Sequence, residues 1–526
     1  MGIYLNPNNA NFRETLSRNI YVDKTMMLAS LNKIMRTGNK YVCVSRPRRF
    51  GKTIAGNMIA AYFSKGCDSR EIFAPYKISH DPSFESNLNK LNVIKIDVNG
   101  EYQSSLNSEK TLKNLTKKLR SEFQNQFKSI QFDDEDSLAS CMLKVYAEKE
   151  ERFVIILDEY DCLVREKVPE ELFAEYMSFL NGLFKNDTLS PAIALAYITG
   201  ILPVVRDRVQ SKLNTFWEYT ILDAGELAEF IGFTDSEVQA LCKQYGMDYK
   251  ECKQWYDGYS QHGFEIYNPE SVVCAVQNKQ ISNYWSKTST YAVINDFISM
   301  NFDGTKADVI KMIAGENIEV NVTRYLNTMT DFTSKNDIFT YLIHVGYLAY
   351  DFKTKTCRIP NNEIREEWKS ALAVNTDYIV TNKIIEASKE AFTQLLAGNS
   401  AAVANALDES HIHVTSNRSY NNEDALQSAI YLAFIYALNK YTVVREMTTG
   451  KGFADVVYIP VYEGDPAIII ELKRNGSTDS ALNQIREKKY FESLEHYSGK
   501  LLFVGINYDE QTKKHTCEIQ EFRRNI

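Results

Sequence analysis

The 526-residue sequence has no C-x-x-C pair, no long repeat, no low-complexity linker and no apolar run of about eighteen residues. The last absence excludes a membrane-spanning helix, and the start of the chain lacks a signal peptide, so we expect a cytoplasmic protein. Nine scattered cysteines argue against a disulfide framework and a thiolate zinc site. A net charge of −8 does not favour coating of nucleic acid by bulk electrostatics, although it is compatible with a local basic groove.

The chain is too long for a single hydrophobic core, and changes of pattern divide it. Early in the chain, apolar runs alternate with helical stretches, and these runs lie at 41–45, 92–98, 153–158 and 192–199. Such alternation predicts a parallel sheet with helices on both faces. A mainly helical section follows, and a helix and several strands end the chain as an α/β unit. We therefore predict three domains, at residues 1–230, 231–375 and 376–526.

The segment SRPRRFGKT ends like a phosphate-binding loop, but Arg46 stands where the pattern G-x-x-x-x-G-K-[ST] has its first glycine. A buried strand enters this loop and a helix leaves it, so backbone N–H groups would face the phosphates. Lys52 would reach the β- and γ-phosphates, and the Thr53 hydroxyl would bind Mg²⁺. The alternative is a basic turn before a helix, and spacing alone leaves the choice open.

A second motif, FVIILDEYD, favours a nucleotide site because it ends a buried strand with Asp158 and Glu159. Asp158 can hold Mg²⁺ directly or through water, and Glu159 can polarise the attacking water. A solvated strand end is the simpler explanation, but two matching halves in the right order on one sheet are hard to obtain by chance. Thr199 ends the next strand, where it could sense the γ-phosphate or be purely structural.

These motifs resemble the bacterial AAA-ATPase-like family. The resemblance is carried by YVDKTMMLASL, SRPRRFGKT, ILDEYD and ITGILPV, and it continues through GFTDSEV, WYDGY, YNPESV and NYW. The family writes its degenerate loop as RPRRFGK[ST], which implies that Arg46 belongs to a P-loop that binds ATP and Mg²⁺. The nucleotide-binding residues expected on this basis are Arg46, Pro47, Arg48, Arg49, Phe50, Gly51, Lys52, Thr53, Asp158 and Thr199.

Near the C-terminus, the segment FADVVYIPVYEGDPAIIIELKRN predicts a hairpin centred near Glu463. Asp455 then lies opposite Glu471, and Lys473 shares a face with Glu471 because side chains alternate along a strand. Two carboxylates can hold Mg²⁺, which lowers the pKa of a bound water, and a lysine can position that water. The alternative is an exposed hairpin with a salt bridge between Glu471 and Lys473.

This D…E-x-K arrangement resembles the PD-(D/E)xK nuclease superfamily, although Ala454 stands where the strict pattern has proline. The resemblance implies a restriction-endonuclease-like α/β fold and a further acidic ligand, Glu423, at the start of the preceding helix. In the following helix it implies that Gln484 and Lys488 face the site or the phosphates. The AAA-ATPase-like family commonly ends in such a domain.

The sequence thus predicts an ATP-binding and ATP-hydrolysing P-loop protein coupled to a Mg²⁺-dependent nuclease-like domain. Catalytic roles fall to Glu159, Asp455, Glu471 and Lys473. The expected metal ligands are Thr53, Asp158, Glu423, Asp455 and Glu471. We expect a nucleic-acid partner, DNA favoured over RNA, and no membrane; an oligomer is compatible with the sequence. The alternative is a nucleotide-dependent switch or scaffold whose tail binds nucleic acid or a protein without cleavage.

Overall fold

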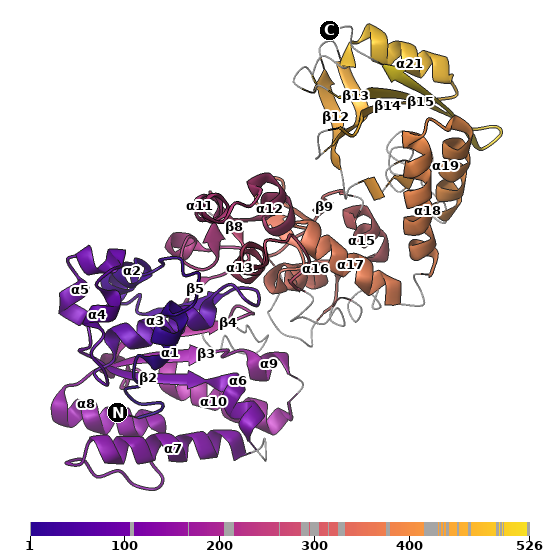
Figure 1. Ribbon diagram of the computed structural model, residues 1–526. Coiled ribbons are helices and arrows are strands. Elements are labelled where there is room, and N and C mark those ends of the chain that lie inside the picture. Colours follow the sequence, from indigo (N-terminus) through magenta and orange to yellow (C-terminus); the bar gives the residue numbers. More distant parts are fainter. Residues whose placement is uncertain are drawn as a thin grey trace. The chain divides into compact units, whose positions relative to one another are not determined.

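The chain folds into two units (Figure 1), one of residues 1–289, 300–305 and 317–365 and one of residues 290–299, 306–316 and 366–526. The predicted domain boundaries after residues 230 and 375 stay predictions. The computed structural model describes all residues except 1, 106–109, 167, 205–214, 262, 286–293, 295–304, 314, 324–331, 375–378, 415–429, 431–432, 435, 438–440, 450–451, 461–463, 491–493, 495–496, 498 and 523–526.

The first unit contains a five-stranded sheet in the order β2-β3-β4-β1-β5, and every neighbouring pair is parallel. The strands are β1 (Tyr41–Ser45), β2 (Asn92–Asp97), β3 (Phe153–Asp158), β4 (Ile193–Gly200) and β5 (Trp217–Tyr219). β1, β3 and β4 are buried along their whole length, which explains their continuous apolar runs. The predicted parallel sheet is confirmed, and β5 is a short addition that the sequence pattern did not indicate.

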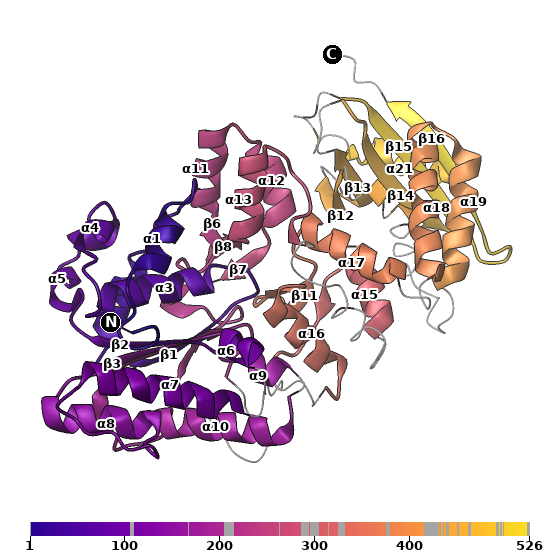
Figure 2. The ribbon, with the colours of Figure 1, turned by 60° about the horizontal axis from the view of Figure 1, so that its bottom comes forward.

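Helices cover both faces of this sheet (Figure 2): α3 (Lys52–Phe63) lies on one face, and α7 (Thr111–Gln126), α8 (Leu138–Lys149) and α10 (Glu170–Phe184) lie on the other. Apolar side chains of α7, α8 and α10 form one core with alternate residues of the strands. The remaining elements of this part are α1 (Ala10–Leu16), α2 (Met27–Ile34), α4 (Arg70–Phe73), η1 (Lys77–His80), α5 (Phe84–Asn87), α6 (Val98–Ser104), α9 (Cys162–Arg165), η3 (Ser190–Ala192) and η4 (Gly225–Leu227).

The middle of the chain is mainly helical, as predicted. Its helices are α11 (Asp235–Tyr245), α12 (Tyr249–Tyr256), α13 (Pro269–Asn278), α15 (Thr305–Ile313), α16 (Lys335–Val345) and α17 (Asn362–Val374). The aromatic-rich connectors add two small antiparallel sheets, β6 (Phe233–Thr234) with β8 (Phe264–Tyr267) and β7 (Tyr259–Gln261), and β10 (Ala349–Asp351) with β11 (Thr356–Arg358) and β9 (Ile318–Glu319). Helix α13 begins after Asn268, whose side chain caps it, with Pro269 in the first turn.

The second unit holds a mixed sheet in the order β12-β13-β14-β15-β16, in which only β14 and β15 pair in parallel. Its strands are β12 (Tyr441–Thr449), β13 (Gly452–Pro460), β14 (Ala467–Arg474), β15 (Leu501–Asp509) and β16 (Lys514–Phe522). Helices α18 (Ile379–Leu396) and α19 (Ser400–Val414) pack on one face, and α21 (Thr478–Glu487) packs on the other. The predicted C-terminal α/β unit is confirmed. No helix among the described residues is long and apolar enough to cross a membrane.

Candidate functional site

The phosphate-loop segment leaves β1 at Ser45 and enters α3 at Lys52, so it lies at the carboxyl end of the parallel sheet. Gly51 caps the helix in the left-handed region, with φ of 91°, and no side chain caps the first turn. A side chain at this φ would be strained, which explains the glycine. The first N–H groups of α3 have no partner within the helix and are available to an anion at this end.

Lys52 is buried at the base of the loop, with 7% of its surface exposed. Its Nζ donates to the backbone carbonyls of Arg46, at 2.9 Å, and Pro47, at 2.7 Å. Burial lowers the pKa of Lys52 to about 8, although the carboxylates of Asp161 and Asp158 favour its charged form. The lysine is therefore held inside the loop, next to the acidic end of β3.

The acidic end of β3 meets the start of α3. Asp158 is 3% exposed, and the Thr53 side chain lies near it. Burial raises the pKa of Asp158, and the nearby Thr53 side chain opposes the rise. Glu159 takes a left-handed φ of 49° and lines the pocket described below. Burial raises its pKa too, while the Arg165 guanidinium, 3.6 Å from Glu159 Oε2, opposes this. Lys52, Thr53, Asp158 and Glu159 thus lie together.

Asp161 is a further acidic residue at this end of the sheet, and sequence reasoning gave it no role. It is fully buried, and its Oδ2 accepts hydrogen bonds from the backbone N–H groups of Ile201, at 3.0 Å, and Leu202, at 2.8 Å. Arg165 Nε lies 2.9 Å from the same oxygen. Asp161 therefore ties the turn after β3 to the turn after β4. The only sequence feature that marked Asp161 was its place as the second aspartate of the DEYD motif.

Arg46 and Thr199 lie beneath the loop and are not among the residues that line the pocket. The Arg46 side chain is fully buried, and its Nη1 donates to the carbonyls of Ser45 and Tyr219, each at 2.8 Å. Burial lowers the pKa of Arg46 to about 10. The Thr199 hydroxyl donates to the Val44 carbonyl at 2.9 Å. Both side chains join neighbouring strands, and their roles in nucleotide binding stay predictions.

Bulky loop residues pack against the helical part of the same unit. Phe50 is 1% exposed and meets the Tyr259 ring edge-on, with ring centroids 5.4 Å apart. Pro47 lies against Gly346, where an added Cβ would come within 2.8 Å of the proline side chain and 3.0 Å of Trp285. Gly346 also needs its glycine for a φ of 90°. The loop is thus fixed by apolar packing on its outer side.

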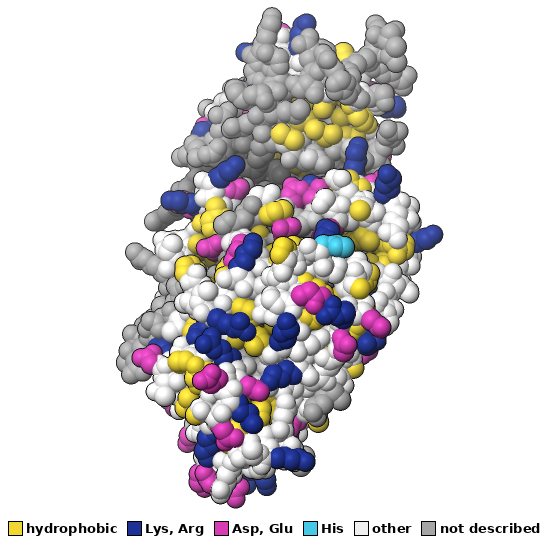
Figure 3. Space-filling model, turned by 90° about the vertical axis from the view of Figure 1, so that its left-hand side faces the viewer, with side chains coloured by type: hydrophobic (Ala, Val, Ile, Leu, Met, Phe, Trp, Pro, Cys, Tyr) yellow, Lys and Arg dark blue, Asp and Glu magenta, His cyan; other side chains and the backbone are white. Residues whose placement is uncertain are grey.

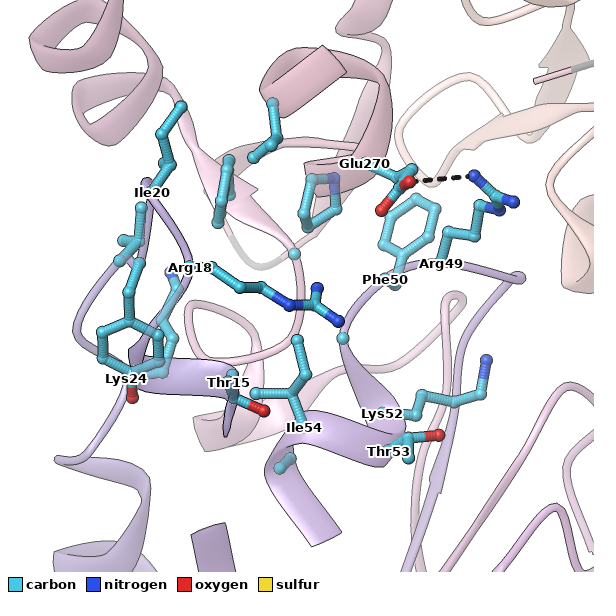
Figure 4. A pocket seen from close by; sticks show the side chains of 18 of the residues that line it. Thr15, Arg18, Ile20, Lys24, Arg49, Phe50, Lys52, Thr53, Ile54 and Glu270 are labelled. Atoms are coloured by element: carbon cyan, nitrogen blue, oxygen red, sulfur yellow. Dashed lines mark ion pairs between the residues drawn. The ribbon is translucent and has the colours of Figure 1, made fainter. Parts of the chain in front are cut away.

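A pocket of about 1050 Å³ opens in front of the loop (Figure 4), and it is lined by the loop, by residues between Thr15 and Lys24, and by α13. Arg18 points into it from the N-terminal segment. At its edge, Arg49 Nη1 forms an ion pair with Glu270 of α13 at 3.1 Å. Arg48 lines the same pocket. The size and the mixed apolar and polar lining suit a ligand as large as a nucleoside triphosphate.

A second candidate site lies on the α21 face of the C-terminal sheet. Strands β13 and β14 pair Val456 with Ile470, so the next step of the antiparallel register sets Asp455 opposite Glu471. Asp455 Oδ2 accepts the Leu472 N–H at 2.7 Å. Glu471 is 2% exposed, and among the described residues its Oε2 has no hydrogen-bond partner. Burial, followed by the Asp455 carboxylate, raises the pKa of Glu471 to about 7.

A lysine and a glutamine complete this C-terminal arrangement. Lys473 Nζ lies 3.0 Å from Glu471 Oε1 and donates to Gln484 Oε1 of α21 at 2.6 Å. Gln484 in turn donates to the Tyr490 hydroxyl at 2.9 Å. Lys488 is exposed at the end of α21. Tyr490, which sequence reasoning did not single out, is buried and fixes the glutamine.

The acidic groups of the C-terminal site form a pair. Within the described part of the chain, no group of three or more His, Cys, Asp or Glu residues is arranged to hold a metal ion. Glu423, the expected further ligand, lies outside the described residues. The unpartnered Oε2 of Glu471 beside Asp455 is nevertheless what a divalent cation would use, because hard cations prefer carboxylate oxygens.

Residues 9–210 match the model of the predicted AAA-ATPase family, and residues 421–518 match that of the PD-(D/E)XK nuclease superfamily. The chain joins an AAA-ATPase-like segment to a PD-(D/E)XK nuclease-like segment. Both resemblances inferred from the sequence are thereby confirmed. A relative from Azotobacter chroococcum mcd 1, described as an uncharacterized protein in the vnfD 5′ region, is 21% identical over 515 residues, which cover 94% of this chain and 93% of the relative.

Two solved structures from Aeropyrum pernix show a low level of similarity to this chain. The ORC2 protein, in ADPNP–ADP complexes, has 11% identity and a TM-score of 0.24, and the match covers 66% of this chain and 94% of that one. The ORC1 protein, in complex with DNA, has 10% identity and a TM-score of 0.26, with 94% and 100% covered. The fold assignment rests on the sheet topology and not on these two structures.

Proposed function

We propose that the AAA-ATPase-like segment binds and hydrolyses ATP with Mg²⁺, and that the C-terminal segment is a Mg²⁺-dependent nuclease-like domain that acts on nucleic acid. The observation that carries the first half is the meeting of Lys52, Thr53, Asp158 and Glu159 beside one large pocket at the carboxyl end of a parallel sheet. In open α/β sheets, ligands bind in the crevice at this end.

The position of each polar group in the nucleotide site supports a particular chemical role. The α3 N-terminus and the Lys52 ammonium would bind the terminal phosphates, since both are directed at the loop. Thr53 and Asp158 would hold Mg²⁺, which neutralises phosphate charge when bound. Glu159 would orient the attacking water and accept its proton, and its raised pKa brings it nearer to the working range of a general base.

In the C-terminal site, the carboxylates of Asp455 and Glu471 would hold Mg²⁺, which lowers the pKa of a bound water and neutralises phosphate charge. The residues fit this cation because one buried carboxylate oxygen of Glu471 has no partner among the described residues. Lys473 would position the water, and Gln484 and Tyr490 keep the lysine oriented. The closely paired carboxylates repel each other, so a cation would relieve the repulsion.

The packing of the loop supports a coupling between nucleotide state and the helical part. Pro47 and Phe50 are held against Gly346 and Tyr259, and Arg49 is paired with Glu270. A phosphate that attracts Arg49 would weaken this ion pair, since one guanidinium cannot serve both anions fully. ATP binding or hydrolysis would therefore shift the helical part, and through it gate the tail.

One observation favours the alternative, a nucleotide-dependent switch or scaffold whose tail binds nucleic acid or a protein without cleavage. Lys473 already forms an ion pair with Glu471, so the described acidic pair is partly neutralised without a metal. Superfamily members that have lost activity can keep the fold, and fold alone does not establish the reaction.

The two halves are tested on the full-length protein with ATP, Mg²⁺ and labelled DNA or RNA. Lys52→Ala should lower ATP turnover by about a hundredfold or more, because it removes the cation placed against developing phosphate charge. Glu471→Gln should abolish cleavage and leave ATP turnover intact. The matched controls, Lys243→Ala on the surface of α11 and Glu487→Gln on α21, remove the same charges from exposed positions and should leave both activities intact.

Equal ATP turnover by wild type and Lys52→Ala would remove the nucleotide assignment. A wild-type protein that hydrolyses ATP and binds nucleic acid, yet leaves DNA and RNA uncut with Mg²⁺ or Mn²⁺, would establish the switch in place of the nuclease.

A further inference from the structure

A second hollow, of about 450 Å³, lies at the opposite end of the N-terminal sheet. Four cationic side chains line it, Arg36, Lys65, Lys90 and Arg152, together with Glu150 and Glu151. We call the hollow that these four cations line the basic hollow. The amino ends of β2 and β3 lie at the left of Figure 1, and Figure 3 views that side, where Lys and Arg side chains gather among scattered acidic ones.

The backbone fixes these cations to three neighbouring strands. Arg152 directly precedes β3, and Lys90 stands two residues before β2. The Arg36 N–H donates to the Ala194 carbonyl at the start of β4, at 2.8 Å, and the Lys65 N–H donates to the Leu91 carbonyl at 3.0 Å. Strand β3 has six residues, so it separates the basic hollow from the nucleotide pocket by about 20 Å. The two sites are distinct.

The charge in the basic hollow is incompletely balanced. Lys65 pairs with Glu151 at 2.6 Å, and Asn92 donates to the same carboxylate oxygen at 2.7 Å. Within the described ranges the other three cations form no ion pair. Lys90 Nζ donates to the backbone carbonyl of Glu85 at 2.6 Å, and the Arg36 and Arg152 guanidinium groups have no ion-pair partner. Arg152 also lies close enough to Lys40 to help lower the pKa of that lysine, after burial.

A third hollow in the same unit shows the opposite balance. It is lined by Lys113, Lys117 and Arg120 together with Asp134, Glu135, Asp136 and Glu175, so acidic groups outnumber basic ones. The whole chain carries a net charge of −8. An unneutralised group of arginines and lysines on such a chain repels itself and gains from an anion. Arginine binds phosphate oxygens with two parallel hydrogen bonds, which makes phosphate the fitting anion.

We propose that the basic hollow binds the phosphate backbone of nucleic acid, with Arg36 and Arg152 as its main contacts. The proposal rests on the proposed function, which supplies nucleic acid as the substrate of the tail, and it adds a surface of the ATPase-like unit that holds the strand. Such contacts are independent of sequence, so they position the nucleic acid without selecting a base order.

The test is the salt dependence of binding to a fluorescein-labelled DNA duplex, measured by anisotropy with full-length protein. All proteins carry Glu471→Gln and Mg²⁺ is left out, so that no cleavage interferes. The Arg36→Gln/Arg152→Gln variant is compared with Lys113→Gln/Lys117→Gln, which removes the same charge from the third hollow. The arginine variant should bind about tenfold more weakly, and its slope of log affinity against log salt should fall by about 2, about 1 for each phosphate contact.

The control variant should bind within about twofold of the parent with an unchanged slope, because acidic groups outnumber basic ones in the third hollow. Both double variants should keep the ATP turnover and the unfolding temperature of the Glu471→Gln parent, which excludes misfolding as the cause of weaker binding. Equal binding by the two double variants overturns the proposal and leaves the proposed function standing. Binding of polyglutamate, but not of DNA, that depends on the arginines also overturns it, in favour of an acidic protein partner. A parent protein that binds neither DNA nor RNA overturns both.

Discussion

Ionisation of Glu471 should destabilise the C-terminal unit when no cation is bound. Burial is the main reason that the pKa of this carboxyl rises from 4.5 to about 7, and the Asp455 carboxylate adds to it while Lys473 opposes. A folded-state pKa above the unfolded-state value means that the folded protein holds the proton more tightly. The contribution of Glu471 to the stability of this unit is therefore largest below about pH 4.5, falls as the pH rises to about 7, and then stays level.

The size of the effect follows from the same two values. Each pKa unit is worth about 1.4 kcal/mol, so the rise from 4.5 to about 7 amounts to about 3 kcal/mol of unfolding free energy above pH 7. For a unit of this size, 1 kcal/mol moves the unfolding temperature by about 2–4 °C. Glu471→Gln, which cannot ionise, should therefore unfold about 6–12 °C above wild type at pH 8, and the difference should shrink to about a quarter of that at pH 5.

The assay is differential scanning calorimetry of the full-length protein at pH 5 and pH 8, with and without Mg²⁺ or Mn²⁺. Metal should raise the wild-type transition more at pH 8 than at pH 5, because ligands must be deprotonated to bind. It should not raise that of Glu471→Gln. The exposed Glu487→Gln serves as control and should behave as wild type. Coincident transitions for wild type and Glu471→Gln at both pH values would refute the reasoning, as would equal stabilisation of both by metal.

Three further outcomes concern the nucleotide site. Glu159→Gln should keep the rise in unfolding temperature that ATP causes but slow hydrolysis by about a hundredfold or more, since it removes the base alone; turnover at the wild-type rate would contradict this. Asp161→Ala should lower the unfolding free energy of the first unit by about 2–6 kcal/mol in urea unfolding. The substitution leaves the buried N–H groups of Ile201 and Leu202 without an acceptor, which costs about 1–3 kcal/mol for each group; a loss below about 1 kcal/mol would contradict it. ATP affinity, measured by calorimetric titration, should fall above about pH 8 as free Lys52 loses its proton, and Lys52→Ala should lack this dependence.

The strands that carry the sites could be predicted from the sequence because their patterns are local. FVIILD is apolar throughout and forms the fully buried β3, and the alternation in AIIIELKR sets Glu471 and Lys473 on one face of β14. The small sheets of the middle part contain strands of two to four residues, such as Phe233–Thr234, and these are too short to show a period. The same holds for β5 (Trp217–Tyr219).

The contacts missed at the sites are long-range, and local patterns do not encode them. Asp161 acts on backbone N–H groups 40 and 41 residues further along the chain. Tyr490 is the exception, because its hydroxyl accepts from Gln484, which lies only 6 residues earlier in the chain. Arg46 reaches the carbonyl of Tyr219, 173 residues away, on a strand that the sequence did not indicate. Asp161 and Arg46 were visible in motifs, but their partners became known only with the fold.

The fold also explains how a phosphate loop can dispense with its first glycine. The Arg46 N–H donates to the Gly200 carbonyl at 3.1 Å and so extends the parallel ladder one residue beyond β1. An extended residue needs no positive φ, and Arg46 is not among the residues that have one. The left-handed positions fall later, at Arg49 with φ of 68° and at Gly51 with φ of 91°. Glycine is therefore needed at the entry to α3 and not at position 46. The Arg46 side chain instead supports the loop through its contact with β5.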